Sequence, residues 1–300
     1  MFTINDLLLH SRQAETNEYR CNMKYSRNLI AGSLVLLLSA GIIAFAKHVG
    51  SQRHDQPIVE QDDMRPVEEG TFQMGNDNGY LDERPSHEVS LQAFMMDRHE
   101  VTYQEYKEFI DEHPEWEKGS VDIALADLDY LQDWDEGAYP QHKADYPIVC
   151  VSWYAAKAYA EWAGKKLPTE AQWEYAARGS FKNMDYPWGK QFKSRLLRWR
   201  GSKERGLVKV GSYTMNGFRL HDILGNAAEW TSDGYELYQA ERESDPAPSI
   251  NRHLKVVRGG SWRSDQEDVR VSARRASPPN ACLPDVGFRC ILTKKKKERR

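Results

Sequence analysis

The sequence predicts a single loop-rich α+β domain, preceded by one N-terminal apolar helix. Three segments carry helix-capping signals, and short apolar or alternating runs are punctuated by glycine and proline. Helices and strands do not alternate in the βαβ rhythm of a parallel sheet. The length of 300 residues would allow one large domain or two small ones, and it is sufficient for a substantial buried core.

The first element is an apolar segment of 18 residues without a charge, 29–46. Three basic residues precede it: Arg20, Lys24 and Arg27. Such a length suits an uncleaved membrane anchor or a signal peptide. For an anchor, the positive-inside rule places residues 1–28 in the cytoplasm and the rest of the chain in the periplasm or outside the cell.

A signal peptide is the alternative interpretation of the same segment. Ala44-Phe45-Ala46 fits a small-x-small cleavage site, so cleavage near Ala46 would give a secreted protein. We favour an inner-membrane anchor, because residues 1–22 would form an unusually long leader. Both interpretations export everything after Lys47.

Beyond this segment the composition divides the chain into three parts. Residues 47–64 are polar and show no apolar periodicity, which predicts a linker. Residues 65–292 have the composition of a globular domain, and residues 293–300 form a basic tail. The net charge of −4 gives no overall attraction to nucleic acid, so we expect no nucleic-acid partner.

Capping signals place three helices in the domain. Each begins at a residue whose side chain can accept the free backbone N–H groups of a first turn: Thr102, Ser152 and Thr169. The first helix is expected to run to about Glu112 and the third to about Arg178. Gly164 follows the second helix, where a C′ glycine belongs.

Short apolar or alternating runs predict the strands. They are too short for helices, and glycine or proline separates them. These runs are Glu88–Leu91, Phe94–Met96, Ile148–Val151, Leu207–Val210, Lys255–Arg258, Val269–Ser272 and Gly287–Ile291.

The four cysteines are Cys21, Cys150, Cys282 and Cys290. Cys21 precedes the apolar segment, and the other three are an odd number for an oxidising compartment. We therefore expect one disulfide and one free thiol, with the pairing left open. No cysteine lies between Val151 and Ala281.

Several short sequence motifs, referred to below as words, occur in a recognisable order. They include Gly70–Gly75 (GTFQMG), Asp97–Thr102 (DRHEVT), Lys166–Gly179 (KLPTEAQWEYAARG), Gly225–Asp233 (GNAAEWTSD), Arg258–Trp262 (RGGSW) and Gly287–Cys290 (GFRC). Over residues 66–291 the chain closely resembles the formylglycine-generating enzyme family, also called the sulfatase-modifying factor domain. The resemblance implies a loop-rich, single-domain variant of the C-type-lectin-like fold.

The resemblance also implies a copper site that this chain does not carry. Family enzymes oxidise a substrate cysteine to formylglycine with a copper ion held by two thiolates, which lie shortly after the Gly-Gly-Ser word. Ser264 falls at the first thiolate position, and the second falls within Gln266–Val269. Hydroxyl and carboxylate oxygens do not hold Cu(I), so we expect neither copper nor formylglycine generation by the known route.

Four neighbouring residues are the candidates for any remaining catalysis: Ser261, Ser264, Arg275 and Asp285. Ser261 matches the serine near the family's oxygen-binding pocket, and Asp285 stands in place of a family asparagine. Ser264 and Asp285, together with Asp265, Glu267 and Asp268, would form a cluster for a hard metal or acid–base work. A solvated acidic loop, with Arg275 tethering neighbouring loops, is the alternative interpretation.

For calcium, the resemblance implies four ligands at Asp222, Gly225, Ala227 and Glu229. A carboxylate at Asp222, where the family usually has asparagine, adds negative charge and favours Ca²⁺. The family's other calcium loop is replaced by the basic stretch 190–205, so we expect that site to be lost.

Three functions remain open, and whether the chain is an enzyme is left undecided. The favoured one is a binding or scaffolding module for an exported protein, peptide or glycan. The second is a non-thiol oxidoreductase or maturation enzyme acting on an exported peptide or metabolite, and the third is a formylglycine-generating enzyme. Convergence of Ser261, Ser264, Asp268, Arg275 and Asp285 in one pocket, with strongly perturbed pKa values, would favour an enzyme. A groove filled by Trp262 or by the acidic, aromatic insertion 111–146 would not. We expect that insertion to carry specificity.

Overall fold

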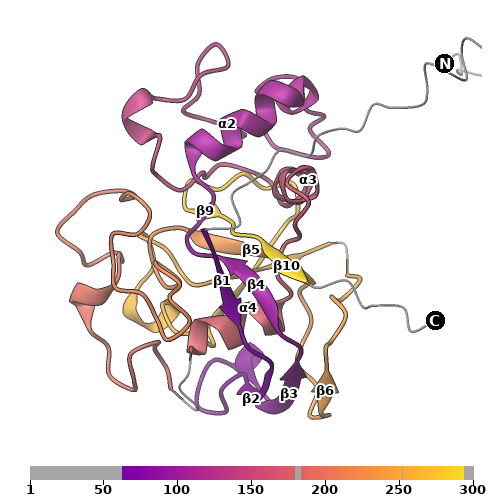
Figure 1. Cartoon of the computed structure of the whole chain (residues 1–300), viewed down its shortest axis with the longest axis vertical. Helices are drawn as coiled ribbons and strands as arrows, with labels where there is room; N and C mark the ends of the chain where they lie inside the picture. The colour runs from indigo at the N-terminus through magenta and orange to yellow at the C-terminus, as the bar shows by residue number, and fades with distance from the viewer. Residues whose placement is uncertain (1–62, 180–183, 252, 294–300) are drawn as a thin grey trace, which may run out of the picture. The chain divides into compact units, whose positions relative to one another are not determined.

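The computed structural model describes residues 63–179, 184–251 and 253–293 (Figure 1). The predicted cytoplasmic segment, the apolar segment 29–46, the linker up to residue 62 and the tail from residue 294 lie outside these residues. Within the described part of the chain, no helix is long and apolar enough to cross a membrane. Strand β1 begins at Met64, so the last residue of the predicted linker belongs to the domain.

The three predicted helices are confirmed as α2 (Tyr103–Glu112), α3 (Trp153–Trp162) and α4 (Glu170–Arg178). Each is capped as expected. In α4, for example, Thr169 Oγ1 accepts the backbone N–H of Gln172 at 3.1 Å, and the Gln172 side chain accepts from Thr169 N at 2.9 Å. Gly164 has a φ of +68°, the conformation that a C′ glycine adopts.

The strands form three small sheets rather than one large one. The first is β1 (Met64–Val67), β4 (Phe94–Asp97) and β10 (Ile291–Thr293). The second is β2 (Gly70–Met74), β3 (His87–Leu91) and β6 (Glu243–Ser244). The third has the order β8 (Arg274–Ser277), β7 (Lys255–Arg258), β5 (Ala228–Gly234) and β9 (Val286–Gly287).

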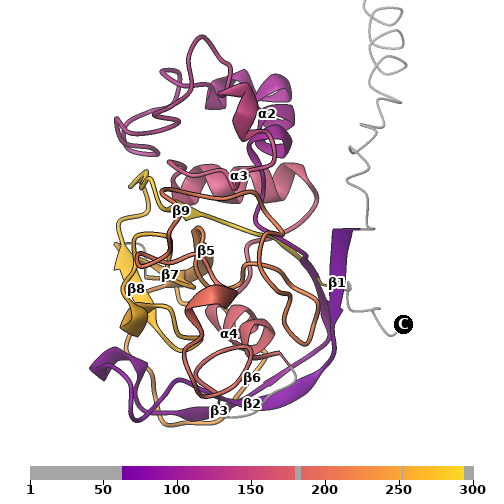
Figure 2. The ribbon, with the colours of Figure 1, turned by 90° about the vertical axis from the view of Figure 1, so that its left-hand side faces the viewer.

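Helix α4 lies between the third sheet and the second, while α2 and α3 lie together beyond the other side of the third sheet (Figures 1 and 2). Trp173 of α4 and Trp230 of β5 are fully buried. The aromatic side chains of the insertion 111–146 pack into the core beside α2 and α3, because Tyr130 and Trp134 are almost completely buried there.

Three of the strand predictions are wrong. Ile148–Val151, Leu207–Val210 and Val269–Ser272 form no strand. The first run is buried as expected, but its backbone bonds to separate loops: Ile148 N donates to Val101 O at 2.8 Å, and Cys150 N to Leu283 O at 3.0 Å. The predicted run Gly287–Ile291 is split between β9 and β10, and Ala228–Gly234 was not predicted as a strand.

The expected disulfide is also absent from the described residues. Cys150, Cys282 and Cys290 are all buried, free thiols. Burial raises the pKa of Cys150 to about 12, so this thiol stays protonated at neutral pH.

Candidate functional site

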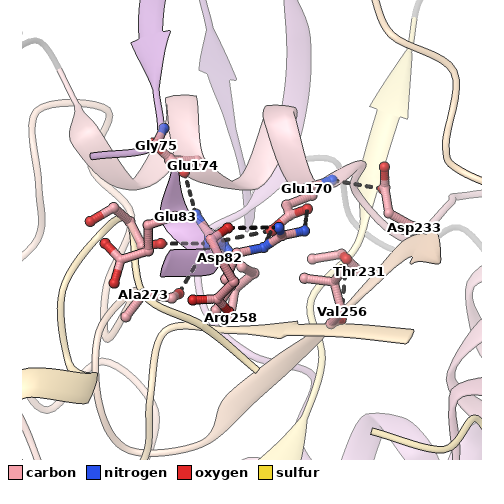
Figure 3. A network of polar contacts seen from close by, with 12 residues as sticks. Gly75, Asp82, Glu83, Glu170, Glu174, Thr231, Asp233, Val256, Arg258 and Ala273 are labelled. Atoms are coloured by element: carbon pink, nitrogen blue, oxygen red, sulfur yellow. Dashed lines mark hydrogen bonds and ion pairs between the residues drawn. The ribbon is translucent and has the colours of Figure 1, made fainter. Parts of the chain in front are cut away.

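A buried network of charges connects α4 with strands β7 and β8, next to the candidate residues (Figure 3). Glu174 accepts hydrogen bonds from Arg178, one turn later in α4, and from Arg258 of β7. Glu170 pairs with Arg274 of β8 through two bonds of 2.7 and 2.8 Å. These contacts fix β7 and β8 against the helix, and Arg275 follows directly in β8.

The turn after β7 requires two glycines. Gly259 and Gly260 have φ angles of +89° and +63°, which side-chain-bearing residues rarely adopt. A Cβ atom on Gly260 would lie 2.7 Å from the backbone oxygen of Asp268. The close approach brings the loop after β7 back on itself and places Ser261 at its start.

The structure brings the four candidate residues together. The Ser261 hydroxyl donates to Asp285 Oδ2 at 2.7 Å, and Ser261 N donates to Ser264 Oγ at 3.0 Å. The guanidinium of Arg275 lies 3.4 Å from the same Asp285 oxygen. Ser261 and Asp285 are buried, whereas the side chain of Arg275 is 43% exposed. The cluster therefore has an accessible and an enclosed half.

A cavity of about 200 Å³ opens at the accessible half, and Ser264 and Arg275 are among its lining residues. Asp268 also lines it, with its carboxylate accepting a 3.3 Å bond from the Tyr80 hydroxyl. Neither Trp262 nor the insertion 111–146 lines this cavity. The cavity can accept a small polar group next to the Ser264 hydroxyl, the guanidinium groups of Arg274 and Arg275, and the Asp268 carboxylate.

Ser264, which the resemblance puts at the first thiolate position, lines the cavity. The run Gln266–Val269, within which the second position is expected, contains no cysteine, and its last residue, Val269, is buried in the core. The residues between Ser264 and Val269 include one short 3₁₀ turn, Gln266–Asp268. Within the described residues, no group of three or more histidine, cysteine, aspartate or glutamate side chains could hold a metal ion.

The wider acidic cluster is not assembled around one point. Asp265 pairs at the surface with Arg200 at 3.0 Å, and Glu267 is exposed. Asp268 alone among these three lines the cavity with Ser264.

The side chains predicted as calcium ligands are buried and already hydrogen-bonded. Glu229 accepts from Arg289 at 2.7 and 2.9 Å and from the Trp173 indole at 2.8 Å. Asp222 accepts from the backbone N–H groups of Gly211 and Tyr213 at 2.5 and 3.1 Å. Gly225 and Ala227 lie on the chain between them, and Ala227 is buried.

Glu100 joins this group, although the sequence analysis gave it no role. Its Oε1 accepts from Asn226 at 3.0 Å, whereas its Oε2 is buried without a hydrogen-bond partner, 3.9 Å from Arg289. Burial, followed by the charge of Asp222, raises the pKa of Glu100 well above its usual value. The charges of Asp222, Glu229 and Glu100 all act on the buried guanidinium of Arg289, but in the described residues these carboxylates are not grouped as ligands of one metal ion, and only Glu100 Oε2 lacks a hydrogen-bond partner. The only sequence signal for Glu100 is its place in the Asp97–Thr102 word.

Comparison with known proteins gives the family. A sequence model of the sulfatase-modifying factor enzyme 1-like domain matches residues 51–294. The chain is 34% identical to the serine/threonine-protein kinase pkn1 of Chlamydia caviae over 78% of its length, but spans only 38% of that protein. It is 30% identical to the formylglycine-generating enzyme of Bos taurus, covering 76% of this chain and 74% of that one. It is 31% identical to the inactive C-alpha-formylglycine-generating enzyme 2 of Bos taurus, covering 74% and 85%.

Solved structures show the same fold. PvdO from Pseudomonas aeruginosa superposes with a TM-score of 0.63 at 25% identity, covering 77% of this chain and 94% of that one. The Treponema denticola variable protein 1 superposes with a TM-score of 0.59 at 19% identity, covering 77% and 95%. The chain therefore belongs to the sulfatase-modifying factor (FGE-sulfatase) domain family.

Proposed function

We propose that this chain is an exported, membrane-tethered binding or scaffolding module, without the copper–thiolate chemistry of formylglycine generation. One observation carries the proposal: no cysteine stands at Ser264 or within Gln266–Val269, where the resemblance expects two thiolates. Hydroxyl, amide, carboxylate and aliphatic side chains do not stabilise Cu(I). A relative whose own name calls it inactive supports the same conclusion.

Arg275 supports a binding role for the small cavity. Its pair with Asp285 is long, at 3.4 Å, and its side chain is 43% exposed, so the guanidinium can donate to a further acceptor. The neighbouring Arg274 already donates to Glu170 and to the carbonyl oxygens of Asp82 and Glu236. A carboxylate or carbonyl group of an exported protein, peptide or glycan would therefore be held by Arg275 and the Ser264 hydroxyl.

Export and tethering rest on the apolar segment 29–46 and the basic residues before it. Protease added to intact spheroplasts is expected to digest the domain and leave a short membrane-bound fragment. A domain that stays protected until the membrane is opened would contradict this part of the proposal.

The experiment for the absent chemistry is an aldehyde assay. The full-length protein is incubated with copper, oxygen and a Cys-x-Pro-x-Arg peptide, and the bovine formylglycine-generating enzyme is assayed in parallel as the positive control. We expect aldehyde from the bovine enzyme only. Aldehyde produced by this protein above the enzyme-free background would overturn the proposal.

A second candidate is a non-thiol oxidoreductase or maturation enzyme for an exported peptide or metabolite. The 2.7 Å bond from the Ser261 hydroxyl to Asp285 favours it, because a carboxylate at this distance can accept a hydroxyl proton. Incubation of the wild type and of Ser261→Ala with a periplasmic extract separates the candidates. A mass change caused by the wild type alone favours the enzyme, and no change in either sample favours the binding module.

A further inference from the structure

A second and larger cavity, of about 620 Å³, lies beside the cavity that contains Ser264. It is lined by residues of two segments, 198–205 and 262–263. They are held together by a 3.1 Å bond from Arg200 N to Ser264 O and by the ion pair of Arg200 with Asp265. The first segment belongs to the basic stretch 190–205, which the functions discussed so far do not use.

The lining of this cavity is strongly positive. One acidic side chain, Glu204, and five basic side chains contribute to it. The basic side chains are those of Arg198, Arg200, Lys203, Arg205 and Arg263. Within the described residues, Asp265 is the only carboxylate that forms an ion pair with any of the five, and it pairs with Arg200. The remaining positive charge faces a concave space, where it raises the local concentration of anions.

The wall of the cavity is preformed. Arg198 is only 2% exposed, and the loop folds around its guanidinium. Its Nε donates to Gly206 O at 2.8 Å, and its Nη2 donates to Glu204 O at 2.7 Å. These bonds hold the backbone that carries Lys203 and Arg205. A ligand therefore meets an ordered loop, which reduces the entropic cost of binding.

We propose that this cavity binds a small molecule through a phosphate or sulfate ester. Guanidinium groups pair with the oxygen atoms of both esters through parallel hydrogen bonds, and Lys203 adds a mobile point charge. The volume lies within the range of small-ligand sites, about 300–1,000 Å³. The site is distinct from the Ser264 cavity, so it stands whether or not the protein is a catalyst.

Calorimetric titration of the full-length protein tests the proposal. The probes are glucose 6-phosphate, glucose 6-sulfate and unmodified glucose, which share one sugar and differ in the charged group. We expect saturable binding of at least one ester, weakened by added salt, and no binding of glucose. The ester that binds more tightly shows whether the cavity prefers a phosphate or a sulfate ester.

Matched charge reversals locate the binding. In Lys203→Glu/Arg205→Glu both changed residues are exposed and line the cavity, and we expect binding to weaken at least about tenfold. The control, Lys190→Glu/Lys193→Glu, changes the net charge equally at exposed positions outside the lining, and we expect affinity within about twofold of the wild type. The proposal is overturned if neither ester binds, if glucose binds equally well, or if both double variants weaken binding alike.

Discussion

Glu174 is a fully buried carboxylate that depends on two buried cations, Arg178 and Arg258. Burial alone would raise the pKa of Glu174, but the two guanidinium charges outweigh burial and lower it. The folded-state pKa therefore lies below the ordinary value of 4.5. The stability that this carboxylate contributes is complete above pH 4.5 and is lost as the pH falls through the folded-state pKa.

We predict that Glu174→Gln lowers the free energy of unfolding by about 3–5 kcal/mol at pH 7, because it leaves buried guanidinium charge without its partner. Urea denaturation measures the loss. The difference from the wild type should shrink as the pH falls below 4.5, because Glu174 is protonated first in the unfolded state and only at lower pH in the folded state.

Glu161→Gln is the control for this prediction. Glu161 pairs with Lys157 at the same i,i+4 spacing, but both side chains are exposed, so the loss should stay below about 1 kcal/mol. Equal losses in the two variants would contradict the account of the buried network.

At the scale of elements, Asp233 joins the end of β5 to the start of α4. Its Oδ2 accepts the backbone N–H of Glu170 at 2.8 Å. Burial, and then the charge of Glu170, raise the pKa of Asp233 to about 6. Because the folded state holds this proton more tightly than the unfolded state, Asp233 makes stability fall as the pH rises from about 4 to 6.

We predict that Asp233→Asn removes this pH dependence, because an amide does not titrate. The free energy of unfolding of the variant, minus that of the wild type, should increase as the pH rises from 4 to 6. Above pH 7 this difference should stay constant. Urea denaturation at a series of pH values measures the difference. A difference that does not change over this range would show that Asp233 titrates normally.

The helices could be predicted from the sequence, and several strands could not. A cap such as Thr169 is a local signal, since its partner Gln172 lies three residues away. A strand requires a partner from elsewhere in the chain. The run Ile148–Val151 has the right composition, but irregular loops take up its backbone hydrogen bonds, and Val269 is buried without joining a sheet.

At the scale of the whole molecule, the sites combine segments that are far apart in the sequence. The family motifs made Ser261 and Asp285 candidates for the same site, and in the structure the Ser261 hydroxyl lies 2.7 Å from Asp285 Oδ2. Glu100 was missed because its partner Asn226 lies 126 residues later. The basic stretch 190–205 was noticed for its charge, but the cavity that it forms with Trp262 depends on the fold.

The family resemblance at Asp222, together with the buried, unpartnered Oε2 of Glu100, leads us to propose a calcium ion near Asp222 that stabilises the whole domain. We predict that millimolar Ca²⁺ raises the Tm of the full-length protein by roughly 5 °C over the value in EGTA. Mg²⁺ should have little effect, because it favours a smaller, octahedral site. Asp222→Ala should abolish the response. A Tm that is the same in Ca²⁺ and in EGTA would contradict a calcium site.

The central claim is that the chain lacks the thiolate pair that holds Cu(I), and copper stoichiometry tests it most directly. The full-length protein is titrated with Cu(I) in competition with a chromophoric chelator, alongside the bovine formylglycine-generating enzyme. Neither Ser264 nor any residue of Gln266–Val269 offers a soft ligand, and the thiols of Cys150, Cys282 and Cys290 are buried, so we predict that the chelator keeps all of the copper in the presence of this protein. Retention of one tightly bound Cu(I) per chain would contradict the claim.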